Sequence, residues 1–356
     1  MAHSNISIFI PHNGCKNQCS FCNQKIISGQ LLQPDRLSVR NTVETALENP
    51  KLDKKNTEIA FFGGSFTAIE NDYMHMLLET AFDYVKKEEI RGIRISTRPD
   101  AINASTLETL KKYGVSSIEL GAQSMSEDVL YANQRGHSAE DVRISAKLIK
   151  KHGFELGLQM MTGLYKSDLK EDMQSALELI ALSPDTMRIY PTVILKGTEL
   201  DSLYLSGEYV PEMLENTVSL CAEILEMCID NGIKVIKLGL HASEDIENQL
   251  VAGVYHPAFR ELVEGELFFS KAQKLIKNRQ SAILSVNPKN LSKMLGHKRK
   301  NIEKFKELGI DVTVRTDSSI GSYDVEYDTC NRKGELCSPP KLHQISLDVR
   351  SENIGT

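Results

Sequence analysis

Short apolar runs alternate with longer amphipathic segments from residue 6 to about residue 240. The segments repeat apolar residues every three or four positions, which predicts helices near 38–48, 71–88, 104–113, 138–152, 168–181 and 212–231. The runs predict strands at Ile6–Ile10, Glu58–Phe62, Gly92–Ser96, Ser117–Leu120, Glu155–Met160, Met187–Tyr190 and Ile233–Leu238. Strand and helix repeated about six times predict an α/β fold with parallel strands and right-handed crossovers. We therefore expect a partial (β/α)6 barrel with helices outside and ligands at the carboxyl ends of the strands.

Three cysteines follow the first run directly. Cys15, Cys19 and Cys22 have the spacing C-x3-C-x2-C on a loop rich in polar residues. Three thiolates on one tight loop can converge on a single inorganic cluster, whereas structural zinc takes four ligands, usually from two C-x2-C pairs. A four-iron cubane held by three cysteines leaves one iron open to a substrate or cofactor. A zinc site that borrows a distant Cys or His, and simple packing of the thiols, are the two alternatives.

The second run leads straight into Gly63, Gly64 and Ser65. Paired glycines at the end of a strand let a ligand approach the backbone with no Cβ in the way, and the serine hydroxyl adds a hydrogen-bond donor. A tight turn between a strand and a helix would use the same residues. Both explanations stay open from these residues taken alone.

The cysteine spacing, the strand before it and Phe21 just ahead of Cys22 resemble the signature of radical S-adenosylmethionine (SAM) enzymes. Gly63 and Gly64 resemble the Gly-Gly-x motif that holds the SAM amino group in that superfamily. The resemblance implies a TIM-like radical SAM barrel, a 4Fe-4S cluster on the three cysteines, and SAM. In such enzymes an electron from the cluster cleaves SAM, and the 5′-deoxyadenosyl radical takes a hydrogen atom from the substrate. A flavodoxin- or ferredoxin-like reductant protein is the implied electron donor.

Several further short sequence blocks resemble one particular family within this superfamily. In chain order they are Ser96–Asp100, Glu119–Ser124, Arg135–His137, Met160–Leu164, Ile189–Thr192 and Gly197–Leu200. Their succession looks like the radical SAM domain of the Elongator catalytic subunit family, which modifies the wobble uridine of tRNA, over about residues 6 to 210. That family also carries an acetyltransferase domain, and the residues after 280, about 75 of them, are too few for one.

The same resemblance implies which residues contact SAM. It assigns the methionyl end to Gly63, Gly64 and Ser65, the ribose region to Ser96 and Gln123, the carboxylate side to Arg135, and a place in the cofactor site to Phe21. A capped turn or a buried hydrogen bond is the alternative for each polar residue. We favour that alternative for Arg98 and Asp100.

Two histidines follow the last run. His241 and Glu244 come directly after it, and His256 opens a helix expected to reach about Asn278. Because histidine titrates near neutrality, these side chains are candidates for substrate contact or proton transfer, with a capping or core role as the alternative. Arg260 is a candidate for the same site or a surface charge.

Residues 281–316 have a different pattern, which predicts a strand (Ala282–Val286), a helix (Lys289–Leu295), a loop (Gly296–Arg299), a helix (Asn301–Leu308) and a strand (Ile310–Val314). This order resembles a KH module, whose Gly-x-x-Gly loop clamps a nucleic-acid backbone, with Arg299 in place of the second glycine. The segment holds eight Lys or Arg against three acids, a net charge of +5 in a chain of net charge −6. It therefore predicts RNA docking through Gly296, Lys298, Arg299 and Lys300, with a solvated helix face as the alternative.

The 356 residues allow one large core and a smaller domain. We expect a barrel (1–240), a helical connector (241–280) and a small basic α/β KH-like lobe (281–356). Seven cysteines, an odd number, and a start without a secretory leader favour a reducing cytoplasm, and no apolar run is long enough to span a membrane. Cys330 and Cys337 could help to bind a metal, although free thiols are the simpler interpretation.

These observations predict a radical SAM enzyme that cleaves SAM reductively with a 4Fe-4S cluster and modifies RNA, with tRNA as its partner. Two other functions stay open. One is a radical SAM enzyme acting on a small-molecule or porphyrin-type substrate. The other is a non-catalytic iron-sulfur protein that binds RNA.

Overall fold

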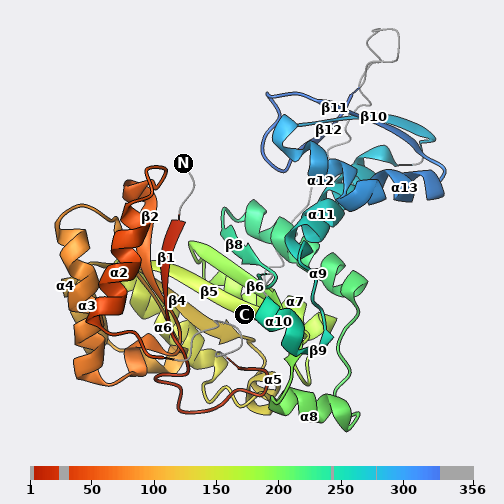
Figure 1. Cartoon of the computed structure of the whole chain (residues 1–356). Coiled ribbons are helices and arrows are strands. Elements are labelled where there is room, and N and C mark those ends of the chain that lie inside the picture. Colours follow the sequence, from red (N-terminus) through yellow and green to blue (C-terminus); the bar gives the residue numbers. More distant parts are fainter. Residues whose placement is uncertain (1–3, 24–31, 242–243, 278, 329–356) are drawn as a thin grey trace, which may run out of the picture. The chain divides into compact units, whose positions relative to one another are not determined.

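The computed structural model describes residues 4–23, 32–241, 244–277 and 279–328 of the chain (Figure 1). The chain divides into two compact units, with the boundary between Leu267 and Phe268. A seven-stranded parallel sheet in the order β1-β2-β3-β4-β5-β6-β8 forms the centre of the first unit. Its strands are β1 (Ser4–Ile10), β2 (Thr57–Gly63), β3 (Gly92–Thr97), β4 (Val115–Gln123), β5 (Glu155–Thr162), β6 (Thr186–Pro191) and β8 (Lys234–Leu238).

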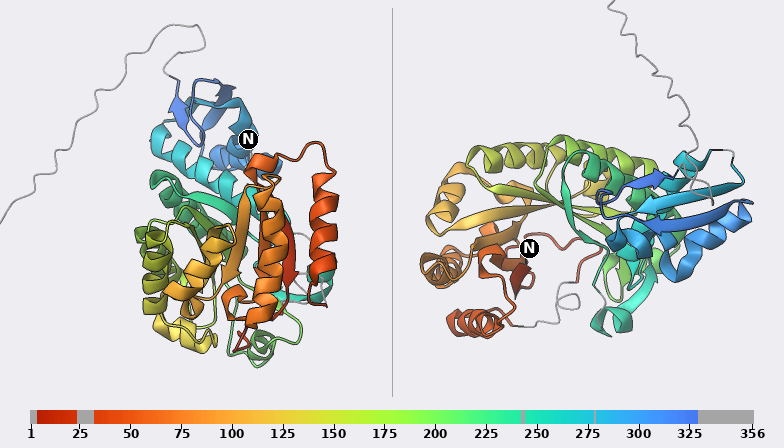
Figure 2. Two further views of the ribbon diagram at one scale, coloured as in Figure 1. Left: turned by 90° about the vertical axis from the view of Figure 1, so that its left-hand side faces the viewer. Right: turned by 90° about the horizontal axis from the view of Figure 1, so that it is seen from above.

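All seven apolar runs of the sequence are strands of this sheet, which confirms the α/β fold. The sheet curls into a half-barrel with helices on its outer face (Figure 2). The sheet has seven strands, one more than a (β/α)6 barrel, because β8 pairs with β6 at its edge.

Six helices connect successive strands, close to their predicted ranges. They are α2 (Arg36–Leu47), α3 (Asn71–Lys86), α4 (Ala104–Lys112), α6 (Ala139–Lys151), α7 (Leu169–Ala181) and α9 (Leu214–Asp230). Ser138 and Asp141 cap the start of α6 reciprocally, which satisfies N–H groups that have no partner within the helix. Two short helices were not predicted, α5 (Glu127–Ala132) and α8 (Glu199–Leu205).

Alternating side chains along the strands separate an apolar outer layer from a polar interior. Ile93, Ile95, Ile118, Met187 and Ile189 are fully buried at alternate positions of β3, β4 and β6. Met187 contacts Cys228 of α9, which places this set on the helix side. The residues between them line the inside of the half-barrel and include charged groups. This period of two follows from the pleat of a strand, and it places polar chemistry inside the barrel.

The segment expected to be a helical connector contains a strand. After α10 (Glu244–Gln249), strand β9 (Leu250–Gly253) pairs antiparallel with β7 (Val193–Leu195). Ile246 is buried against Val193 and Leu195, so this ribbon has its own small core in the first unit. The contacts place residues up to Leu267, within α11 (Phe259–Ile276), in the first unit, so the division between the two units falls inside the expected connector, residues 241–280.

The second unit contains a three-stranded sheet in the order β11-β10-β12. Its described elements are β10 (Ser281–Val286), α12 (Leu291–Leu295), α13 (Lys300–Glu307), β11 (Asp311–Thr316) and β12 (Val325–Tyr327). The order β10-α12-α13-β11 is the one predicted, with apolar side chains such as Leu284, Met294 and Phe305 in the core. Cys330 and Cys337 lie outside the described residues. No helix in the described part of the chain is long and apolar enough to cross a membrane.

Candidate active site

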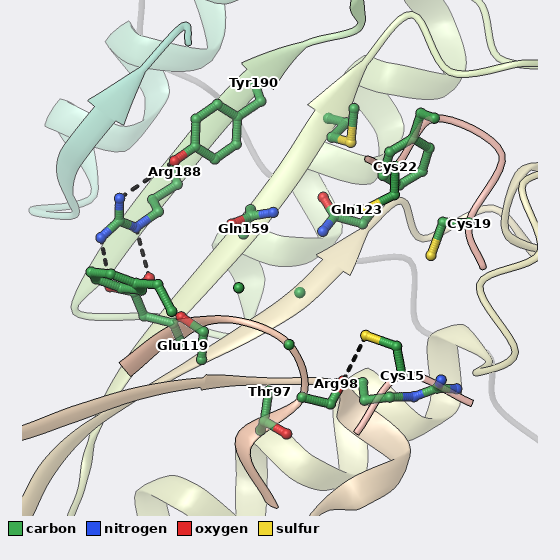
Figure 3. A pocket seen from close by; sticks show the side chains of 18 of the residues that line it. Cys15, Cys19, Cys22, Thr97, Arg98, Glu119, Gln123, Gln159, Arg188 and Tyr190 are labelled. Atoms are coloured by element: carbon green, nitrogen blue, oxygen red, sulfur yellow. Dashed lines mark hydrogen bonds and ion pairs between the residues drawn. The ribbon is translucent and has the colours of Figure 1, made fainter. Parts of the chain in front are cut away.

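A cavity of about 570 Å³ opens inside the half-barrel, at the carboxyl ends of the strands. The structure brings together all ten residues predicted for the cluster and for SAM (Figure 3). Lining this cavity are Cys15, Cys19, Phe21, Cys22, Gly63, Gly64, Ser65, Ser96, Gln123 and Arg135. Residues from strand ends and loops far apart in the sequence thus converge on one space. The four residues predicted for RNA lie elsewhere, in the second unit.

The cysteine loop is held by a buried serine at its centre. The Ser20 hydroxyl donates to Oδ1 of Asn133 at 2.7 Å, and the Ser20 backbone N–H donates to the Asn133 carbonyl at 3.3 Å. On the other side, the N–H of Leu200 donates to the Ser20 carbonyl at 2.8 Å. Because Asn133 caps the end of α5 and Leu200 lies in the first turn of α8, the two unpredicted helices fix the loop that carries the thiols.

The glycines after β2 are required by the cysteine loop itself. A Cβ on Gly64 would lie 2.0 Å from the backbone oxygen of Asn13, closer than any real contact. Gly14 faces the same restriction, since its Cβ would lie 2.3 Å from the Ser65 carbonyl oxygen. The N–H of Ser65 donates to the Asn13 carbonyl at 2.8 Å, so the two loops are bonded as well as packed. Gly64 is thus required by the close approach of the Asn13 backbone, and a role in SAM binding would be additional.

The three thiols lie around one cavity. All three cysteines are half-buried around one cavity, and a backbone hydrogen bond of 3.0 Å from Cys22 to Cys19 closes a turn between two of them. In tetrahedral zinc, Zn–S bonds of about 2.3 Å bring the sulfurs within about 4 Å of one another. Among the described residues, no three His, Cys, Asp or Glu side chains gather in that way. In a cubane each cysteine binds a different iron, so the thiols surround the group instead of meeting.

Two buried polar atoms in the cavity lack a partner and match the functional groups of SAM. Nε of Arg135 is an unused donor, suited to a carboxylate. Oε1 of Gln123 is an unused acceptor, suited to a ribose hydroxyl. Gln123 also has a positive φ of 69°, which a non-glycine residue seldom adopts, at a bulge that ends β4. The strained backbone aims an unpaired amide into the cavity, so these residues fit the implied cofactor.

Arg135 is oriented by its neighbours. Its Nη1 donates to the sulfur of Cys19 at 2.9 Å, and its Nη2 donates to the Gly121 carbonyl at 2.6 Å. Arg98 holds the same loop, because its Nη2 donates to the carbonyls of Arg135 and Gly136 and its Nε donates to Asp100 at 2.6 Å. Arg98 and Asp100 therefore position Arg135.

A charged floor, which we did not predict, lies across the cavity from the cysteines (Figure 3). Nε of Arg188 donates to Glu119 at 2.7 Å, and Nη1 of Arg188 lies 3.4 Å from the Tyr190 hydroxyl. Glu119 also accepts from Nη1 of Arg94 at 3.0 Å. Gln159 and Lys237 complete the floor. The sequence did contain a signal for this floor. Polar residues at alternate positions of otherwise apolar strands all point to the same side of the sheet, here the interior of the half-barrel.

Of the four candidates after the last barrel strand, only His241 lines the cavity in the described structure. His241 lines it, and burial and the charge of Lys237 lower the pKa of His241. His256 accepts the N–H of Ala258 on its Nδ1 at 3.0 Å, which is a capping role. Arg260 pairs with Glu264 at 3.0 Å, and neither Arg260 nor Glu244 lines the cavity.

His137 predicts a measurable pH dependence of stability. Its burial, together with the charge of Arg135, lowers the pKa of His137 from 6.5 to about 4. Between these values the unfolded chain binds the extra proton, so stability is lost as the pH falls. From pH 6.5 to pH 5 this residue should remove about 2 kcal/mol of unfolding free energy.

Urea unfolding of the wild type and of His137→Gln at pH 7 and pH 5 checks this expectation. The variant should lose about 2 kcal/mol less than the wild type between the two pH values. The buried carboxyl of Asp172, whose pKa is raised to about 6 by desolvation, acts in the opposite direction but equally in both proteins. Equal losses in both proteins would contradict the prediction.

Comparison with known protein families gives two matches that adjoin along the chain. The family described as the Radical SAM superfamily matches residues 9–180. The one described as the Radical SAM C-terminal domain matches residues 184–268. The end of the second match nearly coincides with the boundary between the two units at Leu267.

Curated relatives share part of their length with this chain. Elongator complex protein 3 of Mus musculus is 30% identical over 226 residues, covering 58% of this chain and 40% of that protein. The tRNA uridine(34) acetyltransferase of Methanocaldococcus infernus is 27% identical over 181 residues, covering 45% of this chain and 34% of that protein. The chain thus spans well under two thirds of the length of these relatives.

A solved structure supports the fold. The archaeal Methanocaldococcus infernus Elp3 with an N-terminal deletion aligns with a TM-score of 0.58 at 21% identity, over 76% of this chain and 67% of that one. The hydrogenase maturase HydG aligns with a TM-score of 0.52 at 18% identity, over 73% of this chain and 54% of that one.

Proposed function

Because this chain belongs to the radical SAM superfamily and is an SAM-dependent enzyme of it, we propose that it uses a 4Fe-4S cluster and SAM to modify RNA, with a tRNA as substrate. The observation that carries the cofactor part is the convergence of three half-buried thiols with two unpaired polar atoms on one cavity. When bound, cluster and SAM supply a 5′-deoxyadenosyl radical for hydrogen abstraction.

The side chains of the cavity would hold these groups in a fixed arrangement. Cys15, Cys19 and Cys22 would bind the cluster, while Nε of Arg135 would donate to the SAM carboxylate and Oε1 of Gln123 would accept from a ribose hydroxyl. Since Arg135 also donates to the Cys19 sulfur, one guanidinium would contact both groups and set their separation.

The RNA part of the proposal is supported by the second unit. Lys298, Arg299 and Lys300 are exposed in succession at the turn between α12 and α13, and none has an acidic partner among the described residues. Arg299 has a φ of 65°, the left-handed conformation that a glycine usually supplies. The turn thus has positive-φ backbone at both ends, Gly296 and Arg299, as a Gly-x-x-Gly loop would. Three unpaired cations on such a turn suit a phosphate backbone.

Names of the relatives agree with this substrate class, since one is called a tRNA uridine(34) acetyltransferase. Because this chain covers only 34% of that relative, we do not extend the proposal to acetyl transfer. An electron donor of the flavodoxin or ferredoxin type and a cytoplasmic location, where thiolates stay reduced, complete the proposal.

The function can be tested by the modified nucleosides of tRNA. Anaerobically reconstituted protein, SAM and dithionite should convert a nucleoside in tRNA from a strain that lacks this gene, with release of 5′-deoxyadenosine. Mass spectrometry of the digested tRNA should show one nucleoside disappearing and one appearing, matching the difference between the deletion strain and its parent.

Two results would contradict parts of the proposal. Release of 5′-deoxyadenosine with unchanged tRNA, in vitro and in the deletion strain, would support a small-molecule or porphyrin-type substrate instead. Binding of tRNA without release of 5′-deoxyadenosine from protein with a full iron content would support a non-catalytic iron-sulfur protein.

A further inference from the structure

Two basic side chains face each other on the cavity floor. Arg188 on β6 and Lys237 on β8 are direct cross-strand partners, and both line the cavity. Side chains at such positions lie close together, so like charges directly opposite are destabilising. Arginine and lysine would not be placed in this way to stabilise a sheet alone.

The carboxylates near the floor already form ion pairs with arginine side chains. Glu119 receives Nε and Nη2 of Arg188 at 2.7 and 3.1 Å, and it also receives Arg94 at 3.0 Å. Arg94 is bonded in turn to Glu58 at 2.7 Å. Glu119 is thus bonded to two guanidinium groups, and Arg94 also lies 3.5 Å from Glu155.

Lys237 therefore stands without a counter-ion on this floor. In the described structure no carboxylate oxygen lies within ion-pair distance of its ammonium, although the side chain is half-buried. Its surroundings are instead cationic, and the pKa of Lys237 is lowered by burial and by Arg188 and Arg260. Arg260 is itself paired with Glu264. A half-buried ammonium of this kind costs stability unless an anion joins it.

We propose that the cavity floor binds an oxyanion of a small organic substrate, a carboxylate or a phosphate, on the Lys237 ammonium. Nη1 of Arg188 and the Tyr190 hydroxyl, which make only one long contact of 3.4 Å with each other, would be the further donors. His241, whose pKa is lowered by Lys237, lies on the same side of the cavity and would face the rest of that molecule.

The proposal deepens the proposed function and rests on it, because it names a second substrate beside the RNA. RNA bases carry no charge at neutral pH, so a target base alone would leave Lys237 without a partner. A small anionic co-substrate would neutralise it, and the same cavity would hold SAM on its opposite side. The group transferred to the RNA would then come from a molecule that carries a carboxylate or phosphate.

Thermal unfolding tests this inference without any turnover, so its failure can be told apart from failure of the proposed function. The probes are sodium acetate, sodium malonate and sodium phosphate, each compared with sodium chloride at equal ionic strength. At least one oxyanion should raise the melting temperature of the wild type by about 2 °C or more, with a concentration dependence that saturates. A response to acetate or malonate identifies a carboxylate site, and a response to phosphate alone identifies a phosphate site.

Variants at one position decide whether Lys237 is responsible. Lys237→Met should lose the response and should melt about 2 °C higher than the wild type in chloride, because the unpaired charge is gone. Lys237→Arg should keep the response. Lys151→Met, a change of an exposed lysine on α6, should behave like the wild type.

Two outcomes would overturn the proposal. One is that no oxyanion shifts the wild type more than chloride does. The other is that Lys237→Met responds as the wild type does, or melts lower than the wild type in chloride with its response intact.

Discussion

Replacing Cys19 by alanine should remove the bound iron and reduce 5′-deoxyadenosine release by more than about 100-fold. Loss of residues that merely support metal ligands costs 10- to about 100-fold, so loss of a ligand should cost more. The variant also removes the sulfur that receives Nη1 of Arg135 at 2.9 Å, which loosens the predicted contact with the SAM carboxylate. Iron content, the visible absorption of the reconstituted protein and chromatography of the nucleoside product measure these effects.

Cys228→Ala is the matched control for the thiol chemistry. Cys228 is buried in α9, where its sulfur lies 3.6 Å from that of Met187, and it does not line the cavity. Burial raises the pKa of the Cys228 thiol to about 12, so it stays protonated and is a poor ligand. The control should keep its iron and its activity. Unchanged iron content in Cys19→Ala would refute the cluster assignment, and equal loss in both variants would point to misfolding.

A large loss of tRNA binding is expected when the exposed turn of the second unit is changed. Changing Lys298, Arg299 and Lys300 together to alanine should weaken binding of bulk tRNA by at least about tenfold at low salt. It should also reduce the slope of log affinity against log salt by about 3, because three phosphates would no longer be neutralised by a cation of the protein. Filter binding or gel shifts from 50 to 200 mM salt would measure both quantities.

A charge-matched control separates local interactions from net charge. Lys51, Lys54 and Lys55 are exposed between α2 and β2 in the first unit, and their change to alanine removes the same three charges. This control should bind tRNA nearly as the wild type does. Arg299→Gly is a second comparison, because glycine accepts the φ of 65° without strain while it removes one charge. If both triple variants bind equally well, the turn does not bind the RNA.

The barrel and its cysteine site were predictable because their signals are local. Each strand is a short apolar run, and β8 is as clear in the sequence as β1. The three cysteines lie on one loop, so their convergence needs no knowledge of distant contacts. The structure added that Ser20, in the middle of that loop, is buried by partners more than a hundred residues away.

The features that we did not predict all depend on contacts between residues far apart in the sequence. Strand β9 is four residues long and becomes a strand only because β7, far earlier in the chain, pairs with it. The floor combines Glu119, Arg188 and Lys237 from three different strands, and each alone resembles an ordinary charge within a strand. The reason for Gly64 was also hidden, since the atom that excludes a Cβ there belongs to Asn13.

The shared cavity sets an expectation about the order of binding. The three thiols, the residues assigned to SAM and the charged floor all line one cavity. An RNA whose target base enters this cavity covers the groups already bound there. Steady-state kinetics should therefore follow a compulsory order, with SAM and any small anion bound before the RNA.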